Sequence, residues 1–284
     1  MQERKAPPNG THSEQASETW KHIPWRKLER HCFRIQKRIF RASQHGNQRA
    51  VHKLQKLLLK SQAARTLAVR RVTQDNQGKK TAGIDGKTAL LAHQRLTLVQ
   101  AIHPNQWPKK ALPVRRIYIP KPGKEEQRPL GIPTIAERAR QMLVKLALEP
   151  EWEAKFEPNS YGFRPGRSCH DAIEAIFKSI FRKDKYVLDA DIKGCFDNIN
   201  HEALVKKLST YPQLAQAVKA WLQAGALDGD VFVETPSGTP QGGVISPLLA
   251  NIALHGMETA IIGASPSGQH PHVVRYADDF VGAI

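Results

Sequence analysis

The segment Val273-Val274-Arg275-Tyr276-Ala277-Asp278-Asp279-Phe280-Val281 places two adjacent aspartates between two apolar runs. This pattern predicts a hairpin of two short strands, with the acids at its turn. A third aspartate, Asp191, closes another strand-like run that covers residues 186–192 and reads as a buried strand. Because neighbouring carboxylates repel each other when both are ionised, we expect a divalent cation to cancel the repulsion.

These acids predict a magnesium site for phosphoryl transfer. Mg²⁺ is held by one or two carboxylates together with substrate phosphates, and a pair of ions can clamp an in-line displacement. We expect Asp191 and Asp278 to bridge the ions, Asp279 to support them and the carbonyl of Ile192 to add a ligand. An adjacent Asp pair alone more often marks an exposed turn, but the second acid-ended strand favours a template-directed nucleotidyl transferase.

Positive charge is concentrated in the amino-terminal part of the 284-residue chain. The chain has 43 Lys and Arg against 26 Asp and Glu, a net charge of +17. Residues 1–80 contribute 19 basic and 5 acidic residues, or +14, which leaves +3 for residues 81–284. A basic extension on a nearly neutral body is typical of a polyanion-binding protein. Nucleic acid is favoured here over a solvated basic surface or a membrane-surface helix.

Two basic amphipathic helices are predicted in this extension, over residues 25–43 and 47–71. We expect their outward basic side chains, with Arg65 on the same face, to contact nucleic acid. The residues that carry this prediction are Arg30, Arg34, Lys37, Arg38, Arg41, Lys53 and Lys56. Residues 1–19 are polar and are expected to form a disordered tail.

The sequence gives no sign of secretion or of a membrane. Residues 1–19 contain no apolar core of a signal peptide, and no apolar run approaches the length of a membrane span. The three cysteines, Cys32, Cys169 and Cys195, lack metal-ligand spacing and are typical of a reducing compartment. We therefore expect a cytoplasmic protein with no membrane partner.

The body, residues 87–284, alternates predicted strands and helices, which favours an α+β fold with an antiparallel sheet backed by helices. The expected strands are 114–120, 128–132, 186–192, 231–234 and the acid hairpin, and the expected helices are 135–152, 169–182, 201–208, 214–224 and 246–262. Ser168 with Asp171 predicts an N-cap and capping box for the second of these helices.

Four residues are candidates for contacts to a nucleotide. Lys121 and Arg128 flank a hairpin turn from which they could reach a triphosphate, although basic turn residues are common. Gln241 precedes two glycines that permit close backbone approach, or simply form a turn before a helix. Phe196 follows Asp191 by five positions and could exclude a 2′-hydroxyl beneath the sugar, or be an ordinary core residue.

The loop over residues 159–167 pairs aromatic and basic residues. Tyr161, Arg164 and Arg167 suit a nucleic-acid strand held by stacking and phosphate contacts, and equally suit a structural loop. A catalytic triad of Ser168, His170 and Asp171 is excluded, because neighbours on one helical turn cannot align a nucleophile, a base and an orienting acid.

Together these stretches resemble the reverse transcriptases of group II introns, the maturase family. The matching segments occur in the family's order and cover residues 20–75, 81–86, 119–121, 128–133, 161–171, 191–198, 240–247 and 276–279. The resemblance implies the fingers and palm of a right-hand polymerase, preceded over residues 20–86 by a basic RNA-binding extension. It implies Mg²⁺ on Asp191, Asp278 and Asp279. It also implies a dNTP near Lys121, Arg128, Phe196 and Gln241.

The activity implied is RNA-directed DNA synthesis from a DNA or RNA primer on intron RNA, with assistance to splicing. Family members continue past the acid hairpin into the rest of the palm and a helical thumb, so the resemblance predicts an incomplete palm and a thumb that a separate chain could supply. The alternative is a truncated fragment that binds intron RNA through residues 20–80 without catalysis. An RNA-dependent RNA polymerase is a lesser alternative.

Overall fold

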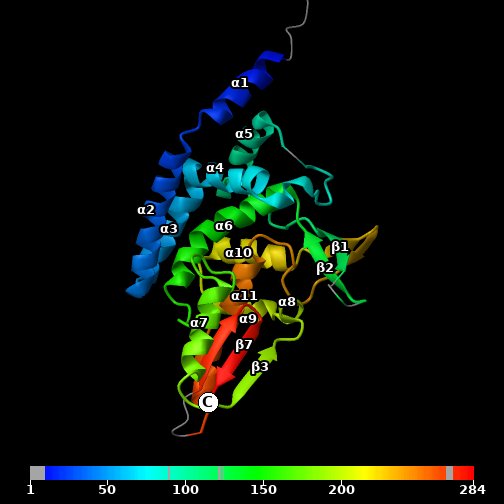
Figure 1. Cartoon of the computed structure of the whole chain (residues 1–284). Coiled ribbons are helices and arrows are strands. Elements are labelled where there is room, and N and C mark those ends of the chain that lie inside the picture. The colour runs from blue at the N-terminus through cyan, green and yellow to red at the C-terminus, as the bar shows by residue number, and fades with distance from the viewer. Residues whose placement is uncertain (1–9, 89, 121–122, 124, 267–270) are drawn as a thin grey trace, which may run out of the picture.

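The computed structural model describes residues 10–88, 90–120, 123, 125–266 and 271–284. A helical amino-terminal part lies at one end of the molecule (Figure 1). A sheet formed by β3 (Val187–Asp191), β7 (Asp279–Ala283) and β6 (His272–Tyr276) lies at the other end, and α6 (Ile135–Glu153) runs between them. Within the described part of the chain, no helix combines the length and apolar character needed to span a bilayer.

The amino-terminal part is built from five α-helices and three short helical turns. They are α1 (Gly10–Lys21), α2 (Trp25–Gln44), α3 (Gln48–Lys60), α4 (Gln62–Arg70), η1 (Arg71–Asp75), η2 (Gln77–Lys80), α5 (Ala92–Ala101) and η3 (Pro104–Gln106). The predicted helix over residues 25–43 is confirmed by α2, which buries Cys32, Ile35 and Ile39.

Three predictions in this part are wrong. Residues 10–19 lie in α1 rather than in a disordered tail, and residues 1–9 of the expected tail lie outside the described residues. The Trp20 indole, in the last turn of α1, is buried and donates to Gln74 Oε1 at 2.8 Å. The single helix over 47–71 breaks at Ser61, whose extended ψ of 124° separates α3 from α4. Arg65 is buried instead of outward, because its guanidinium donates to the Val99 carbonyl at 2.6 Å.

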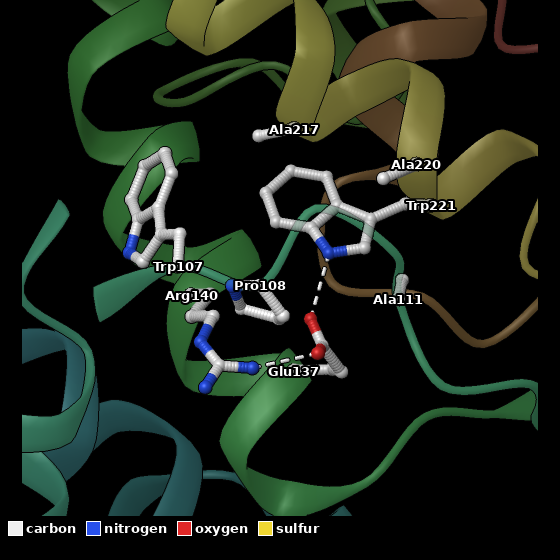
Figure 2. A pocket seen from close by; sticks show the side chains of 8 residues that line it. All are labelled: Trp107, Pro108, Ala111, Glu137, Arg140, Ala217, Ala220 and Trp221. Atoms are coloured by element: carbon white, nitrogen blue, oxygen red, sulfur yellow. Dashed lines mark hydrogen bonds and ion pairs between the residues drawn. The ribbon is translucent and has the colours of Figure 1, made fainter. Parts of the chain in front are cut away.

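Helix α6 (Ile135–Glu153) is the central element of the core and packs against α2, α3, α4 and α11 (Ser246–Leu254). Two carboxylates that it buries, those of Glu137 and Glu151, have partners. Glu137 accepts hydrogen bonds from Trp221 Nε1 at 2.8 Å and from Arg140 at 2.6 Å (Figure 2). Glu151 accepts one from Gln55 Nε2 at 2.7 Å. Since a buried carboxylate without partners costs several kcal/mol, these contacts fix α6 against its neighbours.

One sheet extends the predicted hairpin. Its strands β2 (Gln127–Ile132), β1 (Val114–Pro120), β4 (Ala226–Asp228) and β5 (Val231–Val233) lie in that order. The hairpin β1–β2 is antiparallel, as predicted, but β1 and β4 are parallel. No pattern in the sequence predicted this parallel pair. Strand β4 begins directly after Gly225, whose carbonyl accepts from the Val114 amide at 3.0 Å.

The second sheet carries the acids and is antiparallel throughout, with the order β3 (Val187–Asp191), β7 (Asp279–Ala283) and β6 (His272–Tyr276). Helix α7 (Cys169–Ile180) packs on β6, and its predicted capping box is confirmed. The remaining helices are α8 (Cys195–Asn198), α9 (His201–Leu208), α10 (Pro212–Leu222), α11 (Ser246–Leu254) and α12 (Met257–Ala264).

Two details of this part differ from the sequence predictions. The helix expected over 246–262 is interrupted at Gly256, whose φ of 93° ends α11 and begins α12. Strand β3 is not buried: Val187 is 51% and Leu188 61% exposed, whereas α7 packs on β6 and β7 of the same sheet.

Candidate active site

The register of the second sheet brings the three predicted aspartates together. Asp191, the last residue of β3, is the Cα partner of Asp279, the first residue of β7. Asp278 lies in the turn between β6 and β7, and its carbonyl accepts a hydrogen bond from the Ile192 amide at 3.1 Å. Residues 191 and 278–279, which are remote in sequence, therefore meet at one end of the sheet.

The charges of these acids act on one another. Burial raises the pKa of Asp279 above its ordinary value, and Asp278, Asp191 and Asp189 raise it further. Asp189 was not among the predicted site residues. The Asp-x-Asp spacing in β3 could have identified it, because alternate residues of a strand share one face of the sheet and Asp189 therefore lies on the face of Asp191.

The donor chemistry at this end of the sheet fits Mg²⁺, because carboxylate and carbonyl oxygens are the ligands that hard cations prefer. The carbonyl of Ile192 accepts from the Cys195 amide at 3.1 Å and keeps a second lone pair for a metal. Within the described residues, no three His, Cys, Asp or Glu side chains form a ready coordination group. The register of the backbone thus brings the carboxylates to one end of the sheet.

A buried arginine stabilises the turn at residues 277–278 between β6 and β7, which we call the acid turn. Arg275 donates to the carbonyl of Ala277 at 2.8 Å, to Asn251 Oδ1 at 3.0 Å and to Ser160 Oγ at 2.7 Å. Ala277 has a φ of 60°, a left-handed conformation that costs about 1–2 kcal/mol for a residue with a Cβ. The bond to its carbonyl opposes this cost. Sequence reasoning missed Arg275, although an arginine inside an apolar strand was the available signal.

The loop over residues 159–163 supports the turn from outside. A Cβ on Gly162 would lie 2.3 Å from the amide nitrogen of Ala277, so only glycine permits this approach. The amide of Tyr161 donates to the Arg275 carbonyl at 2.8 Å, and Asn251 donates to the Gly162 carbonyl at 2.8 Å. Loop, turn and arginine therefore form one connected unit.

Phe196 lies in α8, half-buried, and contacts the same loop. Its ring centre is 6.1 Å from that of Phe163, with the planes at 78° in an edge-to-face arrangement. Phe163, which sequence reasoning did not select, has a φ of 62° and is 47% exposed. The structure thus places Phe196 beside the loop that supports the acids, and its role in sugar selection stays a prediction.

Gln241 lies against the first sheet. Its carbonyl accepts from the Gly131 amide at 2.6 Å, and a Cβ on Gly242 would lie 2.9 Å from the Gly131 carbonyl oxygen. A cavity of about 230 Å³ is lined by Gln241 together with Arg116 of β1 and Asp197 of α8. Gly242 thus permits a close approach of the backbone to β2, and the contact of Gln241 to a nucleotide stays a prediction.

The basic candidates divide into two groups. Arg128 is exposed on β2, opposite Ile119, and Lys121 lies outside the described residues. The predicted basic residues of α2 and α3 are all exposed: Arg30, Arg34, Lys37, Arg38, Arg41, Lys53 and Lys56. Their contacts to nucleic acid stay predictions.

The prediction that Arg164 grips nucleic acid is wrong. Its side chain is 3% exposed and donates to both carboxylate oxygens of Glu153 at 2.9–3.2 Å. It also donates to the carbonyls of Glu157 and Ser160, so it holds the loop internally. Tyr161 is half-buried, with the guanidinium of Arg167 5.2 Å above its ring.

A basic helical part joined to a sheet whose hairpin carries paired aspartates is the fingers-and-palm arrangement of the right-hand polymerases. The family description "Reverse transcriptase (RNA-dependent DNA polymerase)" matches residues 119–284, and "N-terminal domain of reverse transcriptase" matches residues 20–102. The chain therefore belongs to the reverse transcriptase family. Reverse transcriptases and polymerases usually use a divalent metal.

Its relatives include proteins of group II introns. The group II intron-encoded protein LtrA of Lactococcus lactis subsp. cremoris is 39% identical over 192 residues, which cover 66% of this chain and 32% of LtrA. Maturase-like protein 1 of Euglena gracilis is 32% identical over 240 residues, or 82% of this chain and 51% of that protein. The chain thus spans about a third to a half of their length.

Among solved structures, a partial Cas6-RT-Cas1–Cas2 complex has a TM-score of 0.48 at 22% identity, covering 81% of this chain and 38% of that chain. The family assignment depends on the sequence matches and not on this likeness.

Proposed function

We propose that the chain is the catalytic part of a group II intron reverse transcriptase. It transfers a nucleotidyl group from a dNTP to the 3′-hydroxyl of a DNA or RNA primer that is paired to an intron RNA template. The observation that carries the proposal is the register that sets Asp191 opposite Asp279, with Asp278 in the adjoining turn. The intron-encoded relatives support RNA as the template.

Mg²⁺ is the proposed cofactor, held by Asp191, Asp278, Asp279 and the carbonyl of Ile192. When bound, the ions would supply positive charge that offsets the charge on the phosphoryl oxygens. Arg275 contributes by fixing the turn that carries Asp278.

The other predicted residues would orient the substrates. Phe196 would lie beneath the sugar and exclude a 2′-hydroxyl, while Gln241 lines the adjoining cavity. Lys121 and Arg128 would contact the triphosphate. Because positioning and charge cancellation supply most of the catalysis in phosphoryl transfer, such contacts suffice for the reaction.

The exposed basic residues of α2 and α3 would hold the RNA, since the amino-terminal 80 residues carry +14 of the net charge of +17. We propose the cytoplasm as the location, where the free Cys32, Cys169 and Cys195 stay reduced.

Primer extension on an RNA template tests the activity. The wild-type chain should add dNTPs in Mg²⁺ and stop in EDTA. Asp278→Asn should reduce the rate about a thousandfold, or about 4 kcal/mol, because the metals supply several kcal/mol of transition-state stabilisation. The matched control is Asp230→Asn, which changes an exposed aspartate next to β5. This variant should extend the primer at the wild-type rate. Equal rates for wild type and Asp278→Asn would overturn the metal assignment.

The second candidate function is RNA binding without catalysis. It is favoured by the exposed basic residues of α2 and α3, which need no metal to bind a polyanion. RNA affinity that falls steeply with salt, combined with no extension by the wild-type chain, would select this function over polymerisation.

A further inference from the structure

An apolar groove lies between α2 and the carboxy-terminal half of α6. Its volume is about 420 Å³, and its apolar walls come from Phe33, Phe40, Pro150 and Pro165. Phe33 is 59% exposed, although it lies on a helix whose outer face is otherwise strongly basic. A phenylalanine ring at the mouth of a groove leaves an aromatic face open for a flat ligand.

The charges around this α2–α6 groove favour an anionic ligand. Lys37 and Arg41 line it, and Lys37 Nζ lies 5.6 Å over the Phe33 ring. Its two acids are already engaged: Glu153 with Arg164 at 2.9 Å and Glu149 with Lys145 at 3.5 Å. The cations on the rim are thus left to contact phosphates.

We propose that the α2–α6 groove binds an unpaired base of RNA. The base stacks on Phe33, and the flanking phosphates contact Lys37 and Arg41. Aromatic side chains interleaved with basic ones are how proteins hold splayed-out bases, since every base has a face that can stack. The inference rests on the proposed function in taking RNA as the partner, and it adds where and in which form the RNA is held.

The groove is connected to the acid turn through one loop. Pro165 forms part of its wall, and Gly162 of the same loop lies directly against Ala277. Arg164, between them, anchors the loop on Glu153 of α6. RNA held in the groove would therefore lie against the segment that supports the aspartates.

Fluorescence of an RNA hairpin with 2-aminopurine at one unpaired position tests the proposal in the full chain. Binding to the wild type should quench the probe, and Phe33→Ala should abolish the quenching and weaken binding about tenfold, a typical loss for one stacked base. The control Leu57→Ala, a 51% exposed residue of α3 outside the groove, should bind and quench as the wild type does. Phe33→Ala and the wild type should bind fully paired RNA with equal affinity.

Salt dependence separates the stacking from the phosphate contacts. Lys37→Ala should reduce the slope of log affinity against log salt by about 0.7, the value for one single-strand phosphate, while Phe33→Ala should leave the slope unchanged. Quenching that persists in Phe33→Ala, or equal affinities for Phe33→Ala and Leu57→Ala, would refute the proposal. A change of sedimentation in Phe33→Ala with unchanged RNA binding would instead identify a protein-docking surface.

A failure of the proposed base site can be distinguished from a failure of the proposed function, because quenching of the probe needs no catalysis. Asp278→Asn should quench the probe as the wild type does. A chain that extends primers without Phe33-dependent quenching would refute the base site alone, and one that quenches without extending would refute the polymerase alone.

Discussion

Arg275 Nη1 donates a 2.8 Å hydrogen bond to the carbonyl oxygen of Ala277, so the strand that enters the acid turn also braces that turn. The same guanidinium reaches Asn251 on α11 and Ser160 on the neighbouring loop. The position of Asp278 thus depends on groups outside its own hairpin.

We expect Arg275→Met to slow nucleotide addition beyond any loss of stability. Removing the buried hydrogen bonds should lower the free energy of unfolding by about 3 kcal/mol. A misplaced turn should also reduce the single-turnover rate per folded molecule about a hundredfold. Arg275→Lys should recover part of the rate.

Leu214→Ala is the matched control, since Leu214 is fully buried in α10 and its loss costs about 2–5 kcal/mol. Its rate per folded molecule should equal that of the wild type. If Arg275→Met also kept the wild-type rate per folded molecule, the arginine would have a purely structural role.

Asp279 predicts a pH-dependent stability. Because its pKa is raised in the folded chain, chiefly by burial and then by the neighbouring acids, the folded state holds the proton more tightly than the unfolded state. The contribution of Asp279 to the free energy of unfolding therefore falls as pH rises from the ordinary carboxyl pKa of about 3.9 through the raised value. At pH 7 its ionised carboxylate destabilises the folded state to the full extent.

Asp279→Asn should accordingly melt at a higher temperature than the wild type at pH 7 in EDTA. The difference should shrink below pH about 4, where the carboxyl is protonated in both states. It should also shrink in Mg²⁺, which offsets the repulsion in the wild type. Thermal melts at both pH values check this, and a variant less stable than the wild type at pH 7 in EDTA would contradict the repulsion.

Local patterns in the sequence predicted local structure well. Apolar spacing gave α2, and Ser168 with Asp171 gave the start of α7, because helical periodicity and capping act between near neighbours. The hairpin β1–β2 and the acid hairpin followed from alternation around turns. The convergence of Asp191 with Asp278 and Asp279 was expected from a shared cation and from the family resemblance, but no pattern predicted the register that pairs Asp191 with Asp279.

What the sequence could not show depends on distant partners. Arg65 and Arg164 look like surface residues, and only the Val99 carbonyl and Glu153 explain their burial. Phe163 supports Phe196 through a ring contact across the fold. The exposure of Leu188 depends on which strands of the sheet α7 covers, and no local pattern encodes that packing.

Phe196→Val should relax the choice of sugar. If the ring excludes a 2′-hydroxyl, its removal should raise ribonucleotide incorporation relative to deoxynucleotide by about ten- to a hundredfold. Phe163→Ala removes the edge-to-face contact and should give a smaller change in the same direction. Competition assays with dNTP and rNTP measure the ratio, and an unchanged ratio in Phe196→Val would exclude a steric gate.

Replacing Arg164 should change the stability of the chain, whereas replacing Arg34 should change its RNA binding. Arg164→Ala leaves Glu153 without its partner in a largely buried pair, and it should cost about 3–5 kcal/mol of stability. Arg34 is exposed on α2, so Arg34→Ala should leave stability unchanged and reduce the salt dependence of RNA binding. Denaturant unfolding and salt titrations distinguish them. An unaltered unfolding midpoint in Arg164→Ala would contradict the structural role.

The most direct test of the cation site is Mn²⁺ binding, followed by the electron paramagnetic resonance signal of the free ion. The wild-type chain should deplete the free-ion signal at pH 7, and Asp230→Asn should do so equally. Asp191→Asn and Asp278→Asn should each lose most of this binding, because the proposed site takes one carboxylate from β3 and another from the turn that follows β6. Equal Mn²⁺ binding by all four proteins would contradict a shared cation between these carboxylates.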